Sequence, residues 1–274
     1  MQSTRFRKVA VLGAGVMGAQ IAAHLVNLKV SAVLFELTAK EGDPSGLVKK
    51  ALDALAKIEP SPIASSDVLQ QIVPANYDQH LEWLRECDLI IEAIAERTDW
   101  KKSLYERIAP YVAEHAIIAS NTSGLSITQL AQALPEQLRP RFCGVHFFNP
   151  PRYMHLVELI AHPGTRPEVM NQLEGFLTTT LGKGVIRAKD TPNFIANRVG
   201  VFSMLATMHH CVQFGLGFDT VDALTGPAIG RPKSATFRTA DIAGVDLMRP
   251  LTNAAFKAIE AAWHQHLWLP CDRL

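Results

Sequence analysis

The stretch that decides the fold reads Val9-Ala10-Val11-Leu12-Gly13-Ala14-Gly15-Val16-Met17-Gly18, and Ala32-Val33-Leu34-Phe35-Glu36 follows it after a helix-like run. The apolar run Val9–Leu12 predicts a short buried strand, and the apolar spacing within Ala19–Leu28 predicts a helix. Ala32–Phe35 predicts a second strand that ends at an acid. This order of strand, glycine turn, helix, strand and acid indicates a dinucleotide site rather than a chance glycine-rich turn.

Each part of this motif has a physical role in dinucleotide binding. Gly13 allows the tight turn, Gly15 lets the backbone approach a pyrophosphate, and Gly18 lets helix and strand pack closely. The helix N-terminus offers N–H groups and a partial positive charge to the phosphates. Glu36 would accept hydrogen bonds from the adenosine ribose and repel a 2′-phosphate, which predicts NAD rather than NADP. The cofactor-binding residues predicted at the turn are Gly13, Gly15, Val16, Met17 and Gly18.

Length and composition limit the class of protein. A chain of 274 residues can bury a sizeable core and is long enough for one large and one small domain. The 27 basic and 26 acidic residues nearly balance, so neither nucleic acid nor a membrane surface is indicated as a partner. No apolar run approaches the roughly 18 residues of a spanning helix. Met1–Lys8 is short and polar, so we expect no secretory signal.

The cysteines and histidines give little support to metal or disulfide chemistry. The four cysteines are scattered, which is typical of core residues in a reducing cytoplasm. His, Cys and carboxylate side chains nowhere cluster at ligand spacing, so we expect no metal site. We therefore expect a cytoplasmic protein.

Strands and helices continue to alternate after Glu36. The predicted strands are Leu89–Ile94 and Ile117–Ser120, and the predicted helices are Leu47–Ile58, Trp100–Val112 and Ser126–Leu134; Ser65-Ser66-Asp67 looks like the start of a short helix. This alternation predicts an α/β protein with a Rossmann-type, doubly wound parallel sheet. Ligands bind beyond the carboxyl ends of such strands, which is where Gly13, Glu96 and Asn121–Ser123 lie in the chain.

The alternation of strands and helices then ends, and a hairpin and a helical domain follow. The loop between Phe142–Phe148 and Leu156–Ile160 is too short for a crossover helix, so these strands should be antiparallel. Helix Pro167–Leu181 and strand Gly184–Ala188 complete a NAD-binding domain of residues 1–188, followed by a small all-helical domain of residues 189–274. A helix is predicted to begin with Thr191 as cap and Pro192 as its first residue. Its candidate core residues up to Phe214 are Phe194, Ile195, Val199, Phe202, Leu205 and Met208.

The hairpin gives the strongest mechanistic inference. If its loop is symmetric about Arg152, His146 lies directly opposite Glu158. Residues opposed in this way share a face, with Cβ atoms about 5 Å apart. A carboxylate beside a histidine fixes its tautomer and raises its basicity, which makes a base and its orienting acid. The alternative is an ordinary histidine at a strand end.

Four motifs carry a resemblance to a known family. They are Ser120-Asn121-Thr122-Ser123, His146-Phe147-Phe148-Asn149-Pro150, Leu156-Val157-Glu158 and Asp190-Thr191-Pro192-x-Phe194-Ile195-x-Asn197-Arg198. Together they resemble the L-3-hydroxyacyl-CoA dehydrogenase family, and most of all the dehydrogenase part of bacterial multifunctional fatty-acid oxidation proteins. The resemblance extends from Lys8 to about Leu247.

The resemblance implies roles for individual residues. His146 matches the catalytic base and Glu158 its paired acid, while Ser123 and Asn197 match residues that hydrogen-bond the reacting oxygen or hold the acyl thioester. For the cofactor the resemblance implies NAD contacts from Glu96, Lys101, Ser123 and Asn149. A turn-forming Ser123, a surface amide at Asn197 and a solvated Lys101 are the plainer alternatives.

The implied function is NAD-dependent oxidation of L-3-hydroxyacyl-CoA to 3-ketoacyl-CoA in the β-oxidation of fatty acids. Three lysines in the segment after the second strand are candidates for binding the CoA phosphates, or else form a solvated helix face: Lys49, Lys50 and Lys57. The resemblance also implies a homodimer formed through the helical domain, or a dehydrogenase within a longer multifunctional chain.

The chain departs from the family pattern at its C-terminal end. Residues 189–274 make a shorter helical domain than the family's, so the sequence looks truncated and two further interpretations stay open. One is a related dehydrogenase for small 3-hydroxy acids, although such enzymes use a lysine on the first helix of the second domain, where this chain has Asn197-Arg198. The other is a chain that binds NAD or acyl-CoA without turnover.

Overall fold

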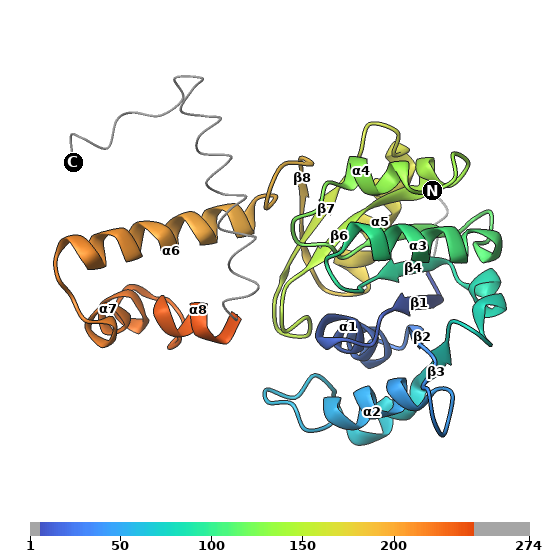
Figure 1. Cartoon of the computed structure of the whole chain (residues 1–274), viewed down its shortest axis with the longest axis horizontal. Coiled ribbons are helices and arrows are strands. Elements are labelled where there is room, and N and C mark those ends of the chain that lie inside the picture. The colour runs from blue at the N-terminus through green and yellow to red at the C-terminus, as the bar shows by residue number, and fades with distance from the viewer. Residues whose placement is uncertain (1–5, 244–274) are drawn as a thin grey trace. The chain divides into compact units, whose positions relative to one another are not determined.

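The computed structural model describes residues 6–243. These residues divide into two compact units, with the boundary between Asp190 and Thr191. The division falls next to the boundary predicted after Ala188. Figure 1 shows the elements of both units in chain order.

The first unit is built on one sheet of eight strands in the order β3-β2-β1-β4-β5-β6-β7-β8. All neighbouring strands run parallel except β6 and β7, which are antiparallel. The carboxyl ends of β1 to β6 therefore meet at one edge, and the predicted Rossmann-type fold is confirmed. The strands are β1 (Lys8–Leu12), β2 (Ser31–Glu36), β3 (Ile72–Asn76), β4 (Leu89–Glu92), β5 (Ile117–Ser120), β6 (Phe142–Phe147), β7 (Leu156–Ile160) and β8 (Gly184–Ala188).

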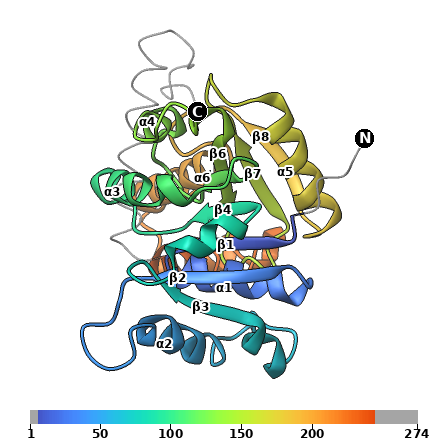
Figure 2. The ribbon, with the colours of Figure 1, turned by 90° about the vertical axis from the view of Figure 1, so that its right-hand side faces the viewer.

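Helices cover both faces of this sheet, so its central strands are buried on both sides and read as continuous apolar runs. One core joins the strands to the first, second and fifth helices, α1 (Val16–Asn27), α2 (Gly46–Leu55) and α5 (Pro167–Thr179). Figure 2 shows α3 (Thr98–Ile108) and α4 (Ile127–Gln132) on the face opposite α5. Short 3-10 helices fill the connections: Ser66–Gln71, Leu81–Glu86, Ala109–Tyr111 and Arg139–Arg141.

Strand β3 was not predicted from the sequence. It pairs with β2 from Ala32↔Ile72 to Glu36↔Asn76 and forms one edge of the sheet. Its central residue is Pro74, which lacks a backbone donor and argues against a strand in any central position. An edge strand needs only one paired side, so the proline is tolerated there.

The second unit contains α6 (Ala196–Gln213), α7 (Phe218–Thr225), a 3-10 turn (Pro227–Ile229) and α8 (Phe237–Ala243). The predicted start of its first helix at Pro192 is wrong. Asn193 and Phe194 have φ of 62° and 46°, a left-handed conformation that no right-handed helix accepts, so α6 begins at Ala196. Asp190, which directly precedes the predicted cap, accepts backbone N–H groups at the N-terminus of α4.

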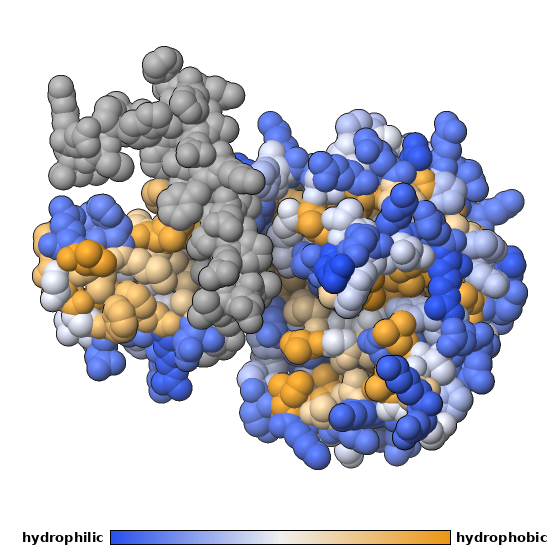
Figure 3. Space-filling model, viewed as in Figure 1, coloured by the Kyte–Doolittle hydropathy of each residue, from blue (hydrophilic) through white to orange (hydrophobic). Residues whose placement is uncertain are grey.

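The core predicted for this first helix is only partly correct. Phe194 is buried, but Ile195, Val199 and Phe202 are exposed, and Leu205 and Met208 are half-buried. Figure 3 shows apolar side chains on the surface of the second unit. Among the described residues, that unit's exposed large apolar side chains are Ile195, Val199, Phe202, Val212, Phe214, Leu216, Phe218, Leu224 and Ile229. Within residues 6–243, no helix combines the length and the apolar character needed to span a bilayer.

Candidate active site

The glycine turn after β1 has the geometry that its sequence predicts. Gly13 has a φ of 104°, and a Cβ on it would lie 2.8 Å from the carbonyl oxygen of Ala93. A Cβ on Gly18 would lie 1.8 Å from the carbonyl oxygen of Gly13, so the helix can meet the turn only at a glycine. Gly15, the N-cap of α1, has nothing within 4 Å of its Cβ position. This open space above a helix N-terminus suits a phosphate.

Glu36 closes the turn from the end of β2. Its carboxylate accepts the backbone N–H of Ala14 at 2.8 Å and that of Leu37 at 2.9 Å. It also lines a cavity of about 520 Å³. The other lining residues are Gly13, Gly15, Leu37, Tyr77, Ala93, Ile94, Ala95, Trp100, Ser103, Leu104 and Arg107. A cavity that joins the two glycines to an acid at the end of the second strand suits the adenosine half of a dinucleotide.

Three residues of this cavity, Tyr77, Trp100 and Arg107, were missed by sequence reasoning. The Arg107 guanidinium donates to the carbonyl of Tyr77 at 2.8 Å and pairs with Asp78. It also lies over the Tyr77 ring, 5.8 Å from the ring centroid. The sequence contained a signal for the cavity residues of the predicted helix. One face of that helix carries residues at helical spacing, which are Trp100, Ser103, Leu104 and Arg107.

The hairpin register agrees with the prediction from its symmetric loop. His146 on β6 pairs directly with Glu158 on β7. His146 Nδ1 lies 2.8 Å from Glu158 Oε2, and both side chains are buried. A carboxylate at Nδ1 fixes the ring's orientation, and the role of His146 as a base stays a prediction.

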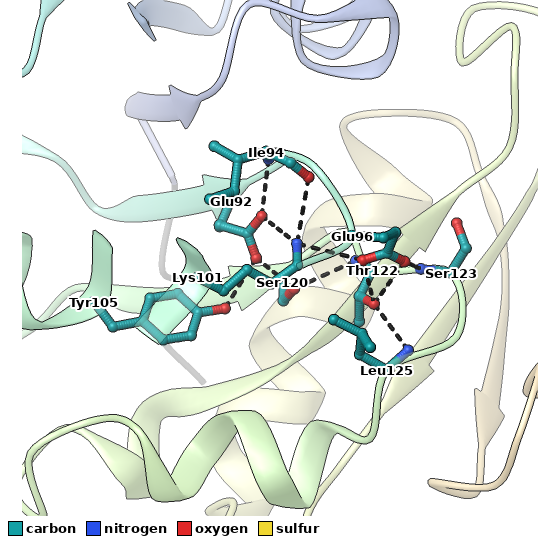
Figure 4. Close-up of polar contacts among 9 residues, drawn as sticks. All are labelled: Glu92, Ile94, Glu96, Lys101, Tyr105, Ser120, Thr122, Ser123 and Leu125. Atoms are coloured by element: carbon teal, nitrogen blue, oxygen red, sulfur yellow. Dashed lines mark hydrogen bonds and ion pairs between the residues drawn. The ribbon is translucent and has the colours of Figure 1, made fainter. Parts of the chain in front are cut away.

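The turn after β5 brings Ser123 to the same edge of the sheet (Figure 4). Glu96 accepts the Ser123 backbone N–H at 2.5 Å and the Thr122 hydroxyl at 2.8 Å. Asn121 Oδ1 accepts the backbone N–H of Phe147 at 2.9 Å, which ties the turn to the residue after His146. Glu96 therefore supports the turn directly, and its contact with NAD stays a prediction.

Lys101 is not a solvated helix lysine. Only 1% of its side chain is exposed, and its Nζ lies 2.5 Å from Glu92 Oε1 and 3.5 Å from Glu96 Oε2. Glu92, which also accepts the hydroxyl of Tyr105, was missed as a site residue. Burial, and then the negative charge of Glu92, raise the pKa of Tyr105 well above its usual range, so this phenol remains a donor. A contact between Lys101 and NAD stays a prediction.

The remaining predicted residues lie at varied positions. Asn149, in the hairpin loop after β6, accepts a hydrogen bond from Gln20 Nε2 at 3.0 Å. Asn197 is the second residue of α6, in the other unit, so its part in the site stays a prediction. The side chains of Lys49, Lys50 and Lys57 are exposed, and Lys49 pairs with Asp43. Val16 is exposed and Met17 packs on the core at the start of α1.

The fold and this edge of the sheet define a dinucleotide-binding protein of the dehydrogenase type. Residues 8–191 match the family description "3-hydroxyacyl-CoA dehydrogenase, NAD binding domain". The chain belongs to the 3-hydroxyacyl-CoA dehydrogenase family, and its first unit is the NAD-binding domain.

Individual relatives agree with this assignment. The chain is 40% identical over 255 residues to a probable 3-hydroxyacyl-CoA dehydrogenase of Bacillus subtilis, and the alignment covers 88% of this chain and 32% of the relative. It is 41% identical over 262 residues to a putative fatty acid oxidation complex trifunctional enzyme of Rickettsia felis, which covers 94% and 36%. The chain thus spans about a third of the length of these two relatives.

A solved structure supports the fold over nearly the whole chain. The (S)-3-hydroxybutyryl-CoA dehydrogenase of Ralstonia eutropha has a TM-score of 0.75 and 29% identity to this chain. The match covers 92% of this chain and 88% of that one.

Proposed function

We propose that this chain is an NAD-dependent L-3-hydroxyacyl-CoA dehydrogenase, which oxidises the C3 hydroxyl of its substrate to a ketone. The observation that carries the proposal is the buried His146–Glu158 pair, 2.8 Å apart, at the same sheet edge as the glycine turn. The names of the relatives support the substrate class, because they are 3-hydroxyacyl-CoA dehydrogenases and a fatty acid oxidation enzyme.

The residues of the glycine turn and cavity fit NAD. Gly13, Gly15 and the α1 N-terminus would hold the pyrophosphate, and Glu36 would hold the adenosine ribose. When bound, NAD supplies the acceptor for the hydride that leaves C3. The chain's own part is to orient the substrate and to move its hydroxyl proton.

His146 Nε2 takes the proton of the C3 hydroxyl as the carbon–hydrogen bond at C3 breaks. The oxygen keeps the electron pair of its broken O–H bond, which forms the second bond of the ketone. Glu158 stabilises the resulting imidazolium through its hydrogen bond to Nδ1. Ser123 and Asn197 donate hydrogen bonds to the reacting oxygen, where charge changes most during the reaction.

The substrate's CoA moiety is anionic, and the segment that follows β2 offers three exposed lysines to it. We assign Lys49, Lys50 and Lys57 to the CoA phosphates, as charged partners at the surface. Replacing all three by glutamine should raise KM for acetoacetyl-CoA and leave the Kd of NADH unchanged. An unchanged KM would remove these lysines from the site.

The wider setting follows from the relatives and the second unit. We propose that the chain acts in the cytoplasm in the β-oxidation of fatty acids, either as a homodimer or as the dehydrogenase of a longer multifunctional protein. The exposed apolar side chains of α6 and α7 support a partner surface on the helical unit. Sedimentation equilibrium tests the dimer, and a monomer at micromolar concentration would contradict it.

One assay tests the function and separates the other interpretations. Acetoacetyl-CoA and NADH are mixed with the protein, and NADH consumption is followed by absorbance. Turnover with acetoacetyl-CoA, and none with free acetoacetate, is the expected result. Turnover with free acetoacetate alone would indicate a dehydrogenase of small 3-hydroxy acids. Binding of NADH without turnover of either compound would indicate a chain that binds and does not catalyse.

A further inference from the structure

Glu92 is a buried carboxylate with an unusual number of donors around it. It is the last residue of β4, its side chain is 0% exposed, and four groups donate to it (Figure 4). The donors are Lys101 Nζ at 2.5 Å, Ser120 Oγ at 2.7 Å, the Ile94 backbone N–H at 2.8 Å and Tyr105 OH at 2.9 Å. A buried ion pair is a poor source of stability compared with apolar packing, so its presence calls for another role.

Two chains of polar contacts lead from Glu92 to the turn that carries Ser123, one of hydrogen bonds alone and one that includes an ion pair. In the first, Ser120 donates to Glu92 and its Oγ accepts the Thr122 backbone N–H at 3.3 Å. In the second, Lys101 lies between Glu92 and Glu96, which are 2.5 Å and 3.5 Å from its Nζ. Glu96 in turn accepts the Ser123 N–H and the Thr122 hydroxyl.

The same turn reaches the strand of His146. The backbone N–H of Asn121 donates to the carbonyl of Glu92 at 2.7 Å, and Asn121 Oδ1 accepts the N–H of Phe147. Glu92 thus contributes to three connections with the turn between β5 and α4, two through its carboxylate and one through its backbone carbonyl.

We propose that Glu92 is a positioning residue for the reaction, which holds Lys101 beside Glu96 so that Glu96 can hold the Ser123 turn in its active geometry. This inference rests on the proposed function for its effect on turnover. The charge of Glu92 is essential to the argument. With a neutral residue there, the Lys101 ammonium would keep Glu96 as its carboxylate partner and draw it away from Thr122 and Ser123.

The test compares Glu92→Gln with Tyr105→Phe, which removes one hydrogen bond from the same carboxylate but keeps its charge and its ion pair with Lys101. In Glu92→Gln, kcat for acetoacetyl-CoA should fall by about tenfold or more, because small displacements of a reacting group are costly. The assay uses saturating NADH, because Glu96 and Lys101 are also predicted to contact NAD. Tyr105→Phe should keep kcat within about twofold of the wild-type value, although its loss of Tm should be similar to that of Glu92→Gln.

A double-mutant cycle shows whether Glu92 acts through Ser123. The variant Glu92→Gln combined with Ser123→Ala should turn over within about twofold of Ser123→Ala alone. Independent, multiplicative losses would overturn the inference, as would a Glu92→Gln variant with wild-type kcat. If Glu92→Gln does not fold, Ser120→Ala replaces it in the same cycle. Ser120→Ala should then lower kcat in the protein that has Ser123 and should not lower kcat further in the Ser123→Ala variant.

Amide hydrogen exchange tests the positioning role of Glu92 without any assay of turnover. A wild-type protein that shows no turnover would overturn the proposed function, and the exchange experiment would still test the inference. Exchange at Asn121–Ser123 should be about tenfold faster in Glu92→Gln than in the wild-type protein, because the Ser123 N–H loses its acceptor. It should be unchanged in Tyr105→Phe. Equal exchange in Glu92→Gln and the wild-type protein would contradict the positioning role.

Discussion

The environment of a buried histidine decides what it can do, and the first unit contains two contrasting cases. His146 lies against the Glu158 carboxylate, which suits a base that must carry a positive charge during reaction. His24 on α1 is also buried, but its charged neighbours are Lys183 and Arg152. Burial, and then the positive charge of Lys183, lower the pKa of His24 from 6.5 to about 4. His24 therefore stays neutral at pH 7.

The lowered pKa of His24 predicts that the free energy of unfolding decreases in acid. Its folded pKa lies below its unfolded value, so the unfolded state binds more protons as pH falls from about 6.5 toward 4, and stability is lost across that window. Between pH 7 and pH 5 this loss is about 2 kcal/mol. His24→Leu should remove it, so that the variant gains on the wild-type protein as pH falls. Urea unfolding at both pH values measures this, and a pH-independent difference would contradict it.

Glu36 predicts cofactor choice. Glu36→Ala removes the acceptor of the Ala14 N–H and, in our account, of the adenosine ribose. The Kd of NAD should rise about tenfold, and discrimination against NADP should fall. Glu41→Ala removes the same charge from the exposed loop after β2 and should change neither affinity. Titrations in which Glu36→Ala binds both cofactors as the wild-type protein does would refute this ribose placement.

At the scale of elements, α4 begins with a cap supplied from 63 residues away. Asp190 Oδ1 accepts the Ile127 N–H at 2.9 Å, and Oδ2 accepts the Thr128 N–H and the Ser126 hydroxyl, both at 2.8 Å. Burial raises the pKa of Asp190, but these hydrogen bonds together outweigh it and bring the pKa below its usual value. The end of the first unit is thereby fixed to the helix that packs on Gly144 beside His146.

Asp190→Ala should lower the free energy of unfolding by about 1–2 kcal/mol, the usual cost of a lost helix cap. Because the folded pKa is lowered, this stabilisation is present above pH 3.8 and is lost as pH falls below it. Glu168→Ala, at an exposed position in the first turn of α5, should cost less than about 0.5 kcal/mol. Equal losses in the two variants would show that Asp190 acts only as a surface charge.

Much of this architecture could be predicted from the sequence because local patterns agree with it. The buried strands of a doubly wound sheet are continuous apolar runs, and the loop symmetry about Arg152 was enough to place His146 opposite Glu158. Features set by tertiary context could not be predicted in this way. Pro74 argued against a strand, although β3 forms at the edge of the sheet. Thr191-Pro192 resembled a helix start, although Asn193 and Phe194 adopt the left-handed conformation.

The same limit applies to the candidate site. The glycine turn, Glu36 and the hairpin pair were visible because each has a fixed spacing in the chain. Glu92 looked like one more residue of an apolar strand end, and nothing local distinguishes a carboxylate that four donors will surround. Only the packing of α3 and β5 against β4 brings Lys101, Tyr105 and Ser120 to it.

At the scale of the whole molecule, the chain combines a NAD-binding unit with a helical unit rich in exposed apolar side chains. The first unit contains the glycine turn, His146 and Glu158, while Asn197 belongs to the second. The match with a solved structure covers 92% of the chain and so extends over residues of both units.

The most direct test of the central claim is the turnover of acetoacetyl-CoA with NADH by His146→Gln, measured beside the wild-type protein and with the Kd of NADH determined for both. Our account predicts a kcat lower by about 10²–10⁴-fold, the usual contribution of a general acid–base residue, and an unchanged Kd. A His146→Gln variant that turns over at the wild-type rate would contradict it.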